Sequence, residues 1–385
     1  MTNLLRLRSI AVCVAASFGC GDGSPAGPLT GVAGDGQLEA ALEVVRENRG
    51  IPALAAALVY EGEVIETGAV GLQAAGSPEA VTTGDLWHIG SLTKAMTATL
   101  AARLVEQGEI AWSTTVGDVF PDLVATMRTE YVDVTFDQLM YHTSGLPLDV
   151  YQTPIWSTLR GDPSPLPEQR RRWAAELLAL QPETSRGTHL YTNAGYVVAG
   201  SMMEELTGET WEELTRREVF EPIGMSAAGF GAPGSAALVD QPRGHVRQGS
   251  AWVPLSPGPL ADNPPAIGPA GTVHLTLADY SRYMAVHVAG ARGGAGLVSS
   301  ESFVKLHMPA PGTDYSLGWA VTERNWANGG VITHNGSNGY WFATVWIAPQ
   351  RDLAMFAVAN AGGDPGQRAT DEAIQVLLAR FEASF

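Results

Sequence analysis

The sequence predicts a mixed α/β (α+β) fold in which an antiparallel sheet, built from both ends of the chain and flanked by helices, carries an inserted, mostly helical lobe. Apolar, strand-like runs occur early, over 53–60 and 64–70, and they return only after residue 315. Between them, from Ser91 to about Pro222, the pattern is mostly helical with long loops. A chain of 385 residues is also long for one simple core, which favours two structural lobes.

The composition is that of a folded globular protein. Hydrophobic residues make up 45% of the chain and charged residues 16%. The formal net charge is −17, and no run of basic residues offsets it. This charge argues against nucleic acids and anionic membrane surfaces as partners.

The first 20 residues have the pattern of an export signal. Arg6 and Arg8 form a short basic start, and an apolar run over 10–16 leads to small residues that end at Cys20. The segment is too short to span a bilayer as a permanent helix. A buried N-terminal strand is the alternative interpretation. We predict an exported protein, either periplasmic or secreted.

Cys20 is a candidate lipidation site. The pair Gly19-Cys20 resembles the end of a bacterial lipoprotein signal, although the two residues before it depart from the usual pattern. A lipid on Cys20 would make the protein a periplasmic or outer-membrane lipoprotein and would be its only contact with a membrane. Loss of Cys13 with the signal leaves no pair for an intramolecular disulfide. Residues 21–36, rich in Gly, Pro and Ser, are expected to form a flexible linker to a domain over 37–385.

The domain is expected to begin with an amphipathic helix over 37–48, which places Leu38, Leu42 and Val45 on one face. A β-hairpin should follow, because Glu61-Gly62-Glu63 joins the two early apolar runs. The later elements are expected, in order, as a helix after Ser91, helices over 170–180 and 196–207, an irregular Pro/Gly-rich segment over 256–272 that could shape a pocket rim, strands over 315–322, 331–334, 341–348 and 353–360, and a closing helix over 368–383. The sheet lobe would then comprise about 37–90 and 270–385, and the helical lobe about 91–269.

Ser91 and Lys94 are the strongest candidates for chemistry. Residues three apart share a helix face, so the Ser91 hydroxyl and the Lys94 amine can meet. Serine needs a neighbouring base, and lysine can serve once burial and nearby positive charge lower its pKa. Gly90 marks the turn into the helix, and Gly108 can cap its C-terminus. Ser91 would sit at a helix N-terminus, where free N–H groups favour a developing negative charge.

The same spacing occurs a second time, in Ser302 and Lys305. The chain has only two lysines among its 23 basic residues, and arginine cannot act as a base. The second copy lies in a short segment closed by Pro309 and has no tyrosine–asparagine pattern after it. We therefore assign the chemistry to Ser91 and Lys94.

A second pattern, Tyr191-Thr-Asn193, follows one hundred positions after Ser91. A tyrosine beside a lysine can relay a proton, and an asparagine can bind both a substrate amide and the lysine. The alternative is structural: Asn193 caps a helix that begins near Ala194, and Tyr191 packs.

A third pattern, His334-Asn-Gly336-Ser337, lies between two strand-like runs. Gly336 would let a ligand lie close against the strand, and the Ser337 N–H could donate to an oxyanion. A histidine at a strand edge can also be purely structural. The turn-rich loop over 142–147 is expected to shape the site rather than to do chemistry.

Metal and cofactor chemistry are not indicated, and no cofactor is expected. His88, His245 and His274 lie apart and lack metal-ligand spacing. The chain has neither a G-x-S-x-G elbow nor a phosphate-binding glycine loop. A Ser-His-Asp hydrolase on another fold would need that elbow.

The order S-x-x-K, Y-x-N and H-x-G resembles that of the serine β-lactamase and penicillin-binding peptidase superfamily. Within it, the likeness is to the class C branch, with its D,D-carboxypeptidases, D-aminopeptidases and family VIII esterases. It covers about 38–378 and implies a β-lactamase/transpeptidase-like fold. Further matching segments are the H-T-S-G-L-P loop over 142–147, Pro222-Ile-Gly-Met225, Pro269-Ala-Gly-Thr272 and Leu317-Gly-Trp319.

The resemblance implies a catalytic role for three residues. Ser91 would be the nucleophile that becomes acylated. Lys94 would take its proton. Tyr191 would share proton transfer to the leaving group and then activate the hydrolytic water, although which of Lys94 and Tyr191 is the base in deacylation stays open.

The resemblance also implies a binding set. Asn193 would hold the amide or carbonyl side of the substrate, and the backbone N–H groups of Ser91 and Ser337 would form the oxyanion hole. His334 and Gly336 would contact the substrate from the strand. Asn360 matches the position of a carboxylate-binding asparagine in relatives.

His334 is the important departure from the pattern, because typical β-lactamases of this branch have lysine there, in K-T-G. Lysine is a permanent cation that attracts a substrate carboxylate, whereas histidine, with a reference pKa of about 6.5, is mostly neutral at pH 7. We therefore predict a serine hydrolase that cleaves an ester or a peptide containing a D-amino acid, with a small molecule or peptide as its partner. The alternatives are a β-lactamase and a catalytically idle protein that binds cell-wall peptide.

Overall fold

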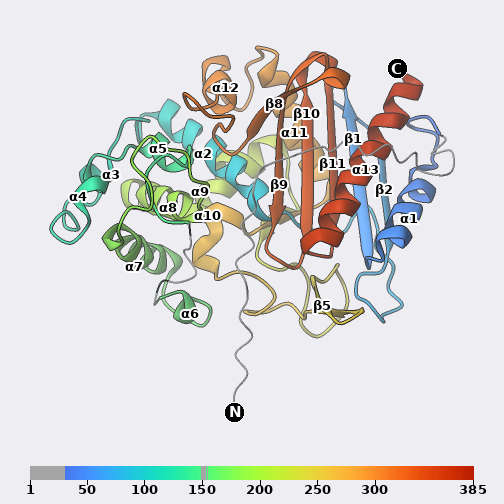
Figure 1. Ribbon diagram of the computed structural model, residues 1–385, viewed down its shortest axis with the longest axis horizontal. Coiled ribbons are helices and arrows are strands. Elements are labelled where there is room, and N and C mark those ends of the chain that lie inside the picture. The colour runs from blue at the N-terminus through green and yellow to red at the C-terminus, as the bar shows by residue number, and fades with distance from the viewer. Residues whose placement is uncertain (1–30, 149–152, 154) are drawn as a thin grey trace.

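The computed structural model describes residues 31–148, 153 and 155–385. The predicted export signal over 1–20, the lipidation candidate Cys20 and most of the predicted linker lie outside the described residues. Figure 1 shows two lobes side by side, one built mainly of helices and the other around a sheet. Among the described residues, no helix combines the length and the apolar character needed to cross a membrane.

A six-stranded antiparallel sheet joins the two ends of the chain, as predicted. Its order is β2-β1-β11-β10-β9-β8, so the N-terminal hairpin pairs with the last strand (Figure 1). Its strands are β1 (Ala53–Tyr60), β2 (Glu63–Gly71), β8 (Ala320–Arg324), β9 (Gly329–Ser337), β10 (Phe342–Ala348) and β11 (Leu353–Ala359). Two small sheets contain β3 (Trp87–His88), β7 (Val273–Leu275) and β4 (Gly229–Phe230), and β5 (His245–Gln248) and β6 (Ala251–Pro254).

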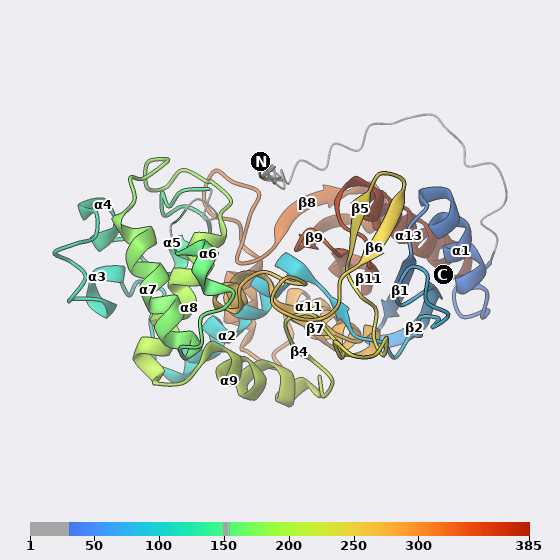
Figure 2. The same ribbon diagram turned by 90° about the horizontal axis from the view of Figure 1, so that it is seen from below.

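Helices cover the sheet on both faces and build the second lobe. Those beside the sheet are α1 (Leu38–Arg49), α11 (Leu277–Ala291) and α13 (Gly363–Ser384), while α12 (Ser300–His307) packs on α11 and α2 (Thr93–Gln107). The others are α2, α3 (Val116–Val119), α4 (Thr129–Val132), α5 (Phe136–Met140), α6 (Trp156–Leu159), α7 (Leu166–Ala179), α8 (Asn193–Thr207), α9 (Trp211–Thr215) and α10 (Gly268–Gly271). Seen from below, α2 lies at the junction of the two lobes (Figure 2).

Strand β1 is buried on both faces, which explains its unbroken apolar sequence. Side chains of a strand alternate between faces, so neighbouring residues enter different cores. Odd-numbered positions from Ala53 to Val59 join the large core shared with the helical lobe and α11. Even-numbered positions from Leu54 to Leu58 pack in a second core with α1 and α13, in front of the sheet in Figure 1.

Three element boundaries differ from the predicted ones for local reasons. Strand β8 begins at Ala320 because the chain first makes a tight turn at Gly318, where φ is +83° and the Ser316 N–H donates to the Trp319 carbonyl. Helix α13 begins at Gly363, since Pro365 in its first turn gives up an N–H that has no helical partner there. Residues 268–271, expected to be irregular and near a rim, form the buried turn α10.

The end of the predicted linker is held by the domain. Arg380, a fully buried residue of α13, donates to the Val32 carbonyl and pairs with Asp35 and Glu66. The Ala33 N–H donates to the Ser384 hydroxyl over 2.6 Å. Residues 31–36 therefore do not behave as the free tether that their composition indicates.

Candidate active site

Ser91 lies in the middle of a 3₁₀ turn, Gly90–Leu92, that leads directly into α2. Gly90 has a φ of +53°, which a glycine adopts without strain. Lys94 follows one turn later, and its Nζ lies 3.0 Å from Ser91 Oγ. The structure therefore brings the two predicted side chains into hydrogen-bonding distance.

Lys94 is fully buried and has three oxygen neighbours, whereas Ser91, Tyr191 and Asn193 beside it are partly exposed. Its Nζ lies 2.7 Å from Asn193 Oδ1 and 2.7 Å from the Ala270 carbonyl, besides Ser91 Oγ. Two of these oxygens only accept, so a neutral amine can donate a proton to each and keep its lone pair for the serine hydroxyl. Burial lowers the pKa of Lys94 well below its ordinary value. The arrangement suits a general base, and burial supplies the shift without any nearby cation.

Asn193 is the first residue of α8, and it does not cap that helix. Thr192 is the N-cap, and its hydroxyl accepts from the Ala194 N–H over 3.1 Å. The Asn193 side chain is thereby left to reach Lys94. The Tyr191 ring lies beside the same amine, with Lys94 Nζ 5.0 Å from the ring centroid.

His142 holds the turn that carries Tyr191. Its carbonyl accepts from the Leu190 N–H over 2.8 Å, and its Nδ1 accepts from the Thr192 N–H over 3.2 Å. Its ring also packs on that of Tyr191, with centroids 4.4 Å apart. His142 has a φ of +59°, an unusual conformation for a residue other than glycine. The loop over 142–147 thus positions the candidate machinery.

The third pattern lies against Ser91 at the free edge of β9. Strand β8 pairs with β9 only as far as Thr333, so residues 335–337 pair with β10 on one side and, within the part of the chain that the structure describes, have no strand on the other. A Cβ atom at Gly336 would lie 2.0 Å from the Ile89 carbonyl, and one at Gly90 would lie 2.3 Å from Ser337 N. Gly336 therefore admits the chain's own backbone, not a ligand as its sequence position predicts. This packing brings the N–H groups of Ser91 and Ser337 to neighbouring positions.

His334 is enclosed by protein groups. Its Nδ1 lies 2.6 Å from the Asn335 carbonyl, so Nδ1 carries the proton, and Nε2 accepts from the Tyr315 hydroxyl over 2.9 Å. Burial, together with the charge of Lys94, lowers the pKa of His334 to about 3. The ring is neutral and both nitrogens have protein partners, which disagrees with the prediction that it contacts substrate.

Asn360 also departs from its predicted role. The residue is fully buried, and its Nδ2 donates to the carbonyls of Leu72 and Gln73 over 3.2 and 3.3 Å. Its own carbonyl lies 2.7 Å from His245 Nδ1. The amide donors that would bind a carboxylate hold a loop instead.

The second serine–lysine copy is divided between other partners. Ser302 donates to Glu106 over 2.6 Å, and Lys305 pairs with Asp137 over 2.8 Å. Each of the two side chains is hydrogen-bonded to a different carboxylate, which is consistent with assigning the chemistry to the first copy.

Sequence reasoning missed two contributors to the site and left the contacts of a third open. The Ala270 carbonyl is a backbone group with no signature of its own, although Pro269-Ala-Gly-Thr272 is one of the segments that carry the resemblance. Tyr315 was included only as the start of a strand. His142 was assigned to shape the site, and only its contacts identify what it holds. Within residues 31–148, 153 and 155–385, no three His, Cys, Asp or Glu side chains are grouped as a metal site requires.

Comparisons with known proteins agree with this geometry. Residues 38–380 match the family described as Beta-lactamase. Penicillin-binding protein 4 of Amycolatopsis lactamdurans is 27% identical over 333 residues, which cover 83% of this chain and 84% of that protein. The D-alanyl-D-alanine-carboxypeptidase/endopeptidase AmpH of Escherichia coli K12 is 20% identical over 71% of this chain and 70% of its own length. The octameric penicillin-binding protein homologue from Pyrococcus abyssi shares the fold, with a TM-score of 0.71 and 22% identity over 89% of this chain and 77% of that one.

Proposed function

The chain belongs to the β-lactamase family and is a serine hydrolase, and from that premise we propose that it hydrolyses an ester or a D-amino-acid-containing peptide through an acyl-enzyme on Ser91. The observation that carries the proposal is the placement of Lys94 Nζ, buried and 3.0 Å from Ser91 Oγ. A binding protein would gain nothing from burying an amine beside a serine, because the buried lysine costs stability whether it stays charged or gives up its proton at neutral pH.

In the first half-reaction Lys94 takes the proton of Ser91 as its oxygen attacks the substrate carbonyl carbon. The negative charge that develops on the carbonyl oxygen is bound by the N–H groups of Ser91 and Ser337. The proton then passes to the leaving alcohol or amine, with Tyr191 as the relay. Collapse of the intermediate breaks the bond to the leaving group and leaves an ester on Ser91.

The second half-reaction repeats these steps with water. Tyr191 or Lys94 takes a proton from the water as its oxygen attacks the Ser91 ester. The same two N–H groups bind the second oxyanion, and Ser91 recovers its proton as the acid product leaves. Asn193 holds the amide or carbonyl side of the substrate while it orients Lys94.

The substrate class follows from the state of His334. A neutral ring whose nitrogens already have protein partners offers no cation to a substrate carboxylate at this position. The buried Asn360 offers no amide donor to one either. We therefore infer a preference for substrates that do not depend on a carboxylate contact here, which places esters, and peptides cleaved away from a free C-terminal carboxylate, above β-lactams. Among the relatives, the name of AmpH includes a carboxypeptidase activity on D-alanyl-D-alanine.

Export is a separate proposal that rests on the first 20 residues alone. Their basic start, apolar run and final Gly19-Cys20 favour translocation, with lipidation of Cys20 as the finer hypothesis. Expression of the full chain in a bacterium, followed by fractionation and intact mass, tests both. A precursor that keeps its N-terminus in the cytoplasm would contradict export.

The activity is tested with wild type and Ser91→Ala side by side. Each is incubated with a fluorescent penicillin and, separately, with a short-chain p-nitrophenyl ester, while intact mass and released nitrophenol are followed. We expect ester turnover in the wild type only, with penicillin giving a slowly hydrolysed adduct or none. Rapid penicillin turnover would identify a β-lactamase, and full ester activity in Ser91→Ala would refute the acyl-enzyme. If the wild type turned over neither probe, the idle binder would be favoured instead.

A further inference from the structure

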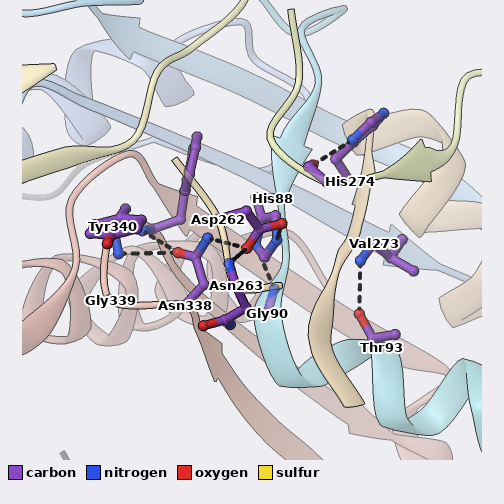
Figure 3. Close-up of polar contacts among 12 residues, drawn as sticks. His88, Gly90, Thr93, Asp262, Asn263, Val273, His274, Asn338, Gly339 and Tyr340 are labelled. Atoms are coloured by element: carbon purple, nitrogen blue, oxygen red, sulfur yellow. Dashed lines mark hydrogen bonds and ion pairs between the residues drawn. The ribbon is translucent and has the colours of Figure 1, made fainter. Parts of the chain in front are cut away.

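A chain of buried hydrogen bonds begins at Gly90, the first residue of the 3₁₀ turn that carries Ser91 (Figure 3). The Gly90 N–H donates to His88 Nδ1 over 3.1 Å, and His88 Nε2 lies 2.9 Å from Asp262 Oδ2. Because Nδ1 accepts, the ring proton sits on Nε2 and is donated to the carboxylate. His88 is 0% exposed and Asp262 is 5% exposed. The residue before Ser91 is therefore held through a histidine by a buried carboxylate.

The other oxygen of Asp262 reaches the turn that follows Ser337. Asp262 Oδ1 accepts from Asn338 Nδ2 over 2.8 Å, and the Asn263 N–H donates to the same oxygen over 2.7 Å. Asn338 Oδ1 in turn accepts from the N–H groups of Tyr340 and Trp341 over 3.1 and 3.2 Å. Figure 3 shows these contacts as one line of side chains from His88 to the Asn338 turn.

The chain therefore connects the two backbone segments that supply the oxyanion donors. Ser91 belongs to the turn into α2, and Ser337 ends β9 beyond the part of that strand paired with β8. Asp262 belongs to neither element, so it can hold both at once. The relative position of two donors matters to catalysis because an oxyanion hole acts by being preorganised for the charge.

We propose that His88, Asp262 and Asn338 form a positioning bridge that fixes the spacing of the Ser91 and Ser337 N–H groups, and this inference rests on the proposed function of those groups. The bridge residues are not catalytic residues. His88 is buried, and its Nδ1 is occupied by the Gly90 N–H, so it cannot take the Ser91 proton. They act through the backbone that they hold.

The neighbours of Asp262 and Asn338 fix which of their atoms donate hydrogen bonds and which accept them, so substitutions that reverse these roles test the bridge. Asp262 receives three donors, so Asp262→Asn turns an amide N–H toward one of them. Asn338→Asp keeps an acceptor for the Tyr340 and Trp341 N–H groups but places two carboxylates in contact. The double variant restores a donor–acceptor pair between positions 262 and 338 with the polarity reversed, while the Asn263 N–H loses its acceptor, so the restoration is partial.

The experiment measures kcat and KM on the p-nitrophenyl ester, and the affinity for a boronic acid. The boronic acid forms a tetrahedral adduct on serine and places one of its oxygens in the oxyanion hole. We expect Asp262→Asn and Asn338→Asp each to lower kcat by about 10- to 100-fold, less than deletion of an oxyanion donor. KM should change by less than about threefold, because the ground-state substrate does not depend on the hole. Boronate affinity should fall in parallel with kcat, and kcat of the double variant should be at least about threefold above that of either single variant.

Asn263→Ala is the matched control, since it removes an asparagine side chain next to Asp262 and leaves the Asn263 N–H in place. Active-site titration counts folded, reactive enzyme, so that loss of protein is separated from loss of rate. Wild-type kcat and boronate affinity per titrated site in both single variants would overturn the bridge. If Asp262→Asn does not fold, Asn338→Asp and Asn338→Ala on the turn decide the question by the same criterion. Ester activity in Ser91→Ala would instead refute the proposed function on which the bridge rests.

Discussion

Replacing Asn193 by aspartate is expected to move the pH profile of the enzyme to higher pH. The two side chains have the same shape, and the substitution places a carboxylate oxygen where Asn193 Oδ1 now lies, 2.7 Å from Lys94 Nζ. An opposite charge at such a distance raises the pKa of an amine by about 1–3 units. Each unit leaves about tenfold less free amine at a pH below the pKa, which corresponds to about 1.4 kcal/mol. At a pH on or below the rising limb of the wild type we therefore expect kcat/KM to fall by about 10- to 1,000-fold.

The fold should tolerate this substitution. Position 193 is the first residue of α8, where a carboxylate faces the positive end of the helix dipole and is favoured by about 0.3–1 kcal/mol. The melting temperature should therefore stay at or above the wild-type value. The same dipole keeps the new aspartate ionised at neutral pH.

The assay is the pH dependence of kcat/KM on the p-nitrophenyl ester between pH 6 and 10. In Asn193→Asp the rising limb should shift upward by about 1–3 pH units, so that much of the activity returns at alkaline pH. Asn193→Ala is the control, because it removes the same contact without adding charge and should lower the rate at every pH without an upward shift. A rising limb in the same place for wild type and Asn193→Asp would refute the assignment of Lys94 as the titrating base.

Three further predictions follow from the contacts. His142→Gly should relieve the strain of the positive φ yet leave the buried Thr192 N–H without its acceptor, which should lower kcat on the ester by about tenfold. His142→Asn keeps an acceptor and tolerates this conformation, so its kcat should stay within about threefold of wild type. Equal losses in the two variants would contradict the positioning role of His142. Ser302→Ala should retain ester activity within about twofold and lose at most about 1 kcal/mol of stability, because it removes only a bond to Glu106; loss of acylation would revive the second serine–lysine copy. Urea unfolding at pH 7.5 and pH 5 should show a lower free energy of unfolding at the acid pH, because burial holds the folded pKa values of His245, His274 and His307 at about 4 and that of His334 at about 3. Between the unfolded pKa of about 6.5 and pH 4 the unfolded chain binds more protons, so stability falls by up to about 1.4 kcal/mol per pH unit for each of these histidines. An equal free energy of unfolding at both pH values would contradict their burial.

Local patterns predicted those parts of the fold that depend on neighbouring residues. The hairpin between β1 and β2 follows from two apolar runs joined by a short turn at Glu61 and Gly62, both with positive φ. The meeting of Ser91 and Lys94 follows from helical spacing, and the αL cap at Gly108 ends their helix as expected. These features needed no knowledge of the rest of the chain.

Contacts between distant segments could not be predicted in the same way. The acceptor that Ala270 offers to Lys94 is a backbone carbonyl, and any residue in that place would carry one. The state of His334 depends on Tyr315, which lies before the β8 turn and closes over the ring from another segment. Asn360 was matched to a carboxylate-binding role, but its position directly after β11 directs the amide toward the carbonyls of Leu72 and Gln73. In each case the type of side chain was known and its surroundings were not.

The burial that makes Lys94 a base also explains why position 334 is neutral in this site. A lysine at 334 would bring a second basic group into the buried region where burial already lowers the pKa values of both Lys94 and His334. Burial disfavours a charged amine there, so a lysine at 334 must either lose its proton or gain an anion. A substrate carboxylate can be that anion, which would couple a charged lysine at 334 to acidic substrates such as β-lactams. With His334 neutral and hydrogen-bonded to Tyr315, the site needs no anion to balance it, and an uncharged acyl group can bind without leaving an unpaired charge.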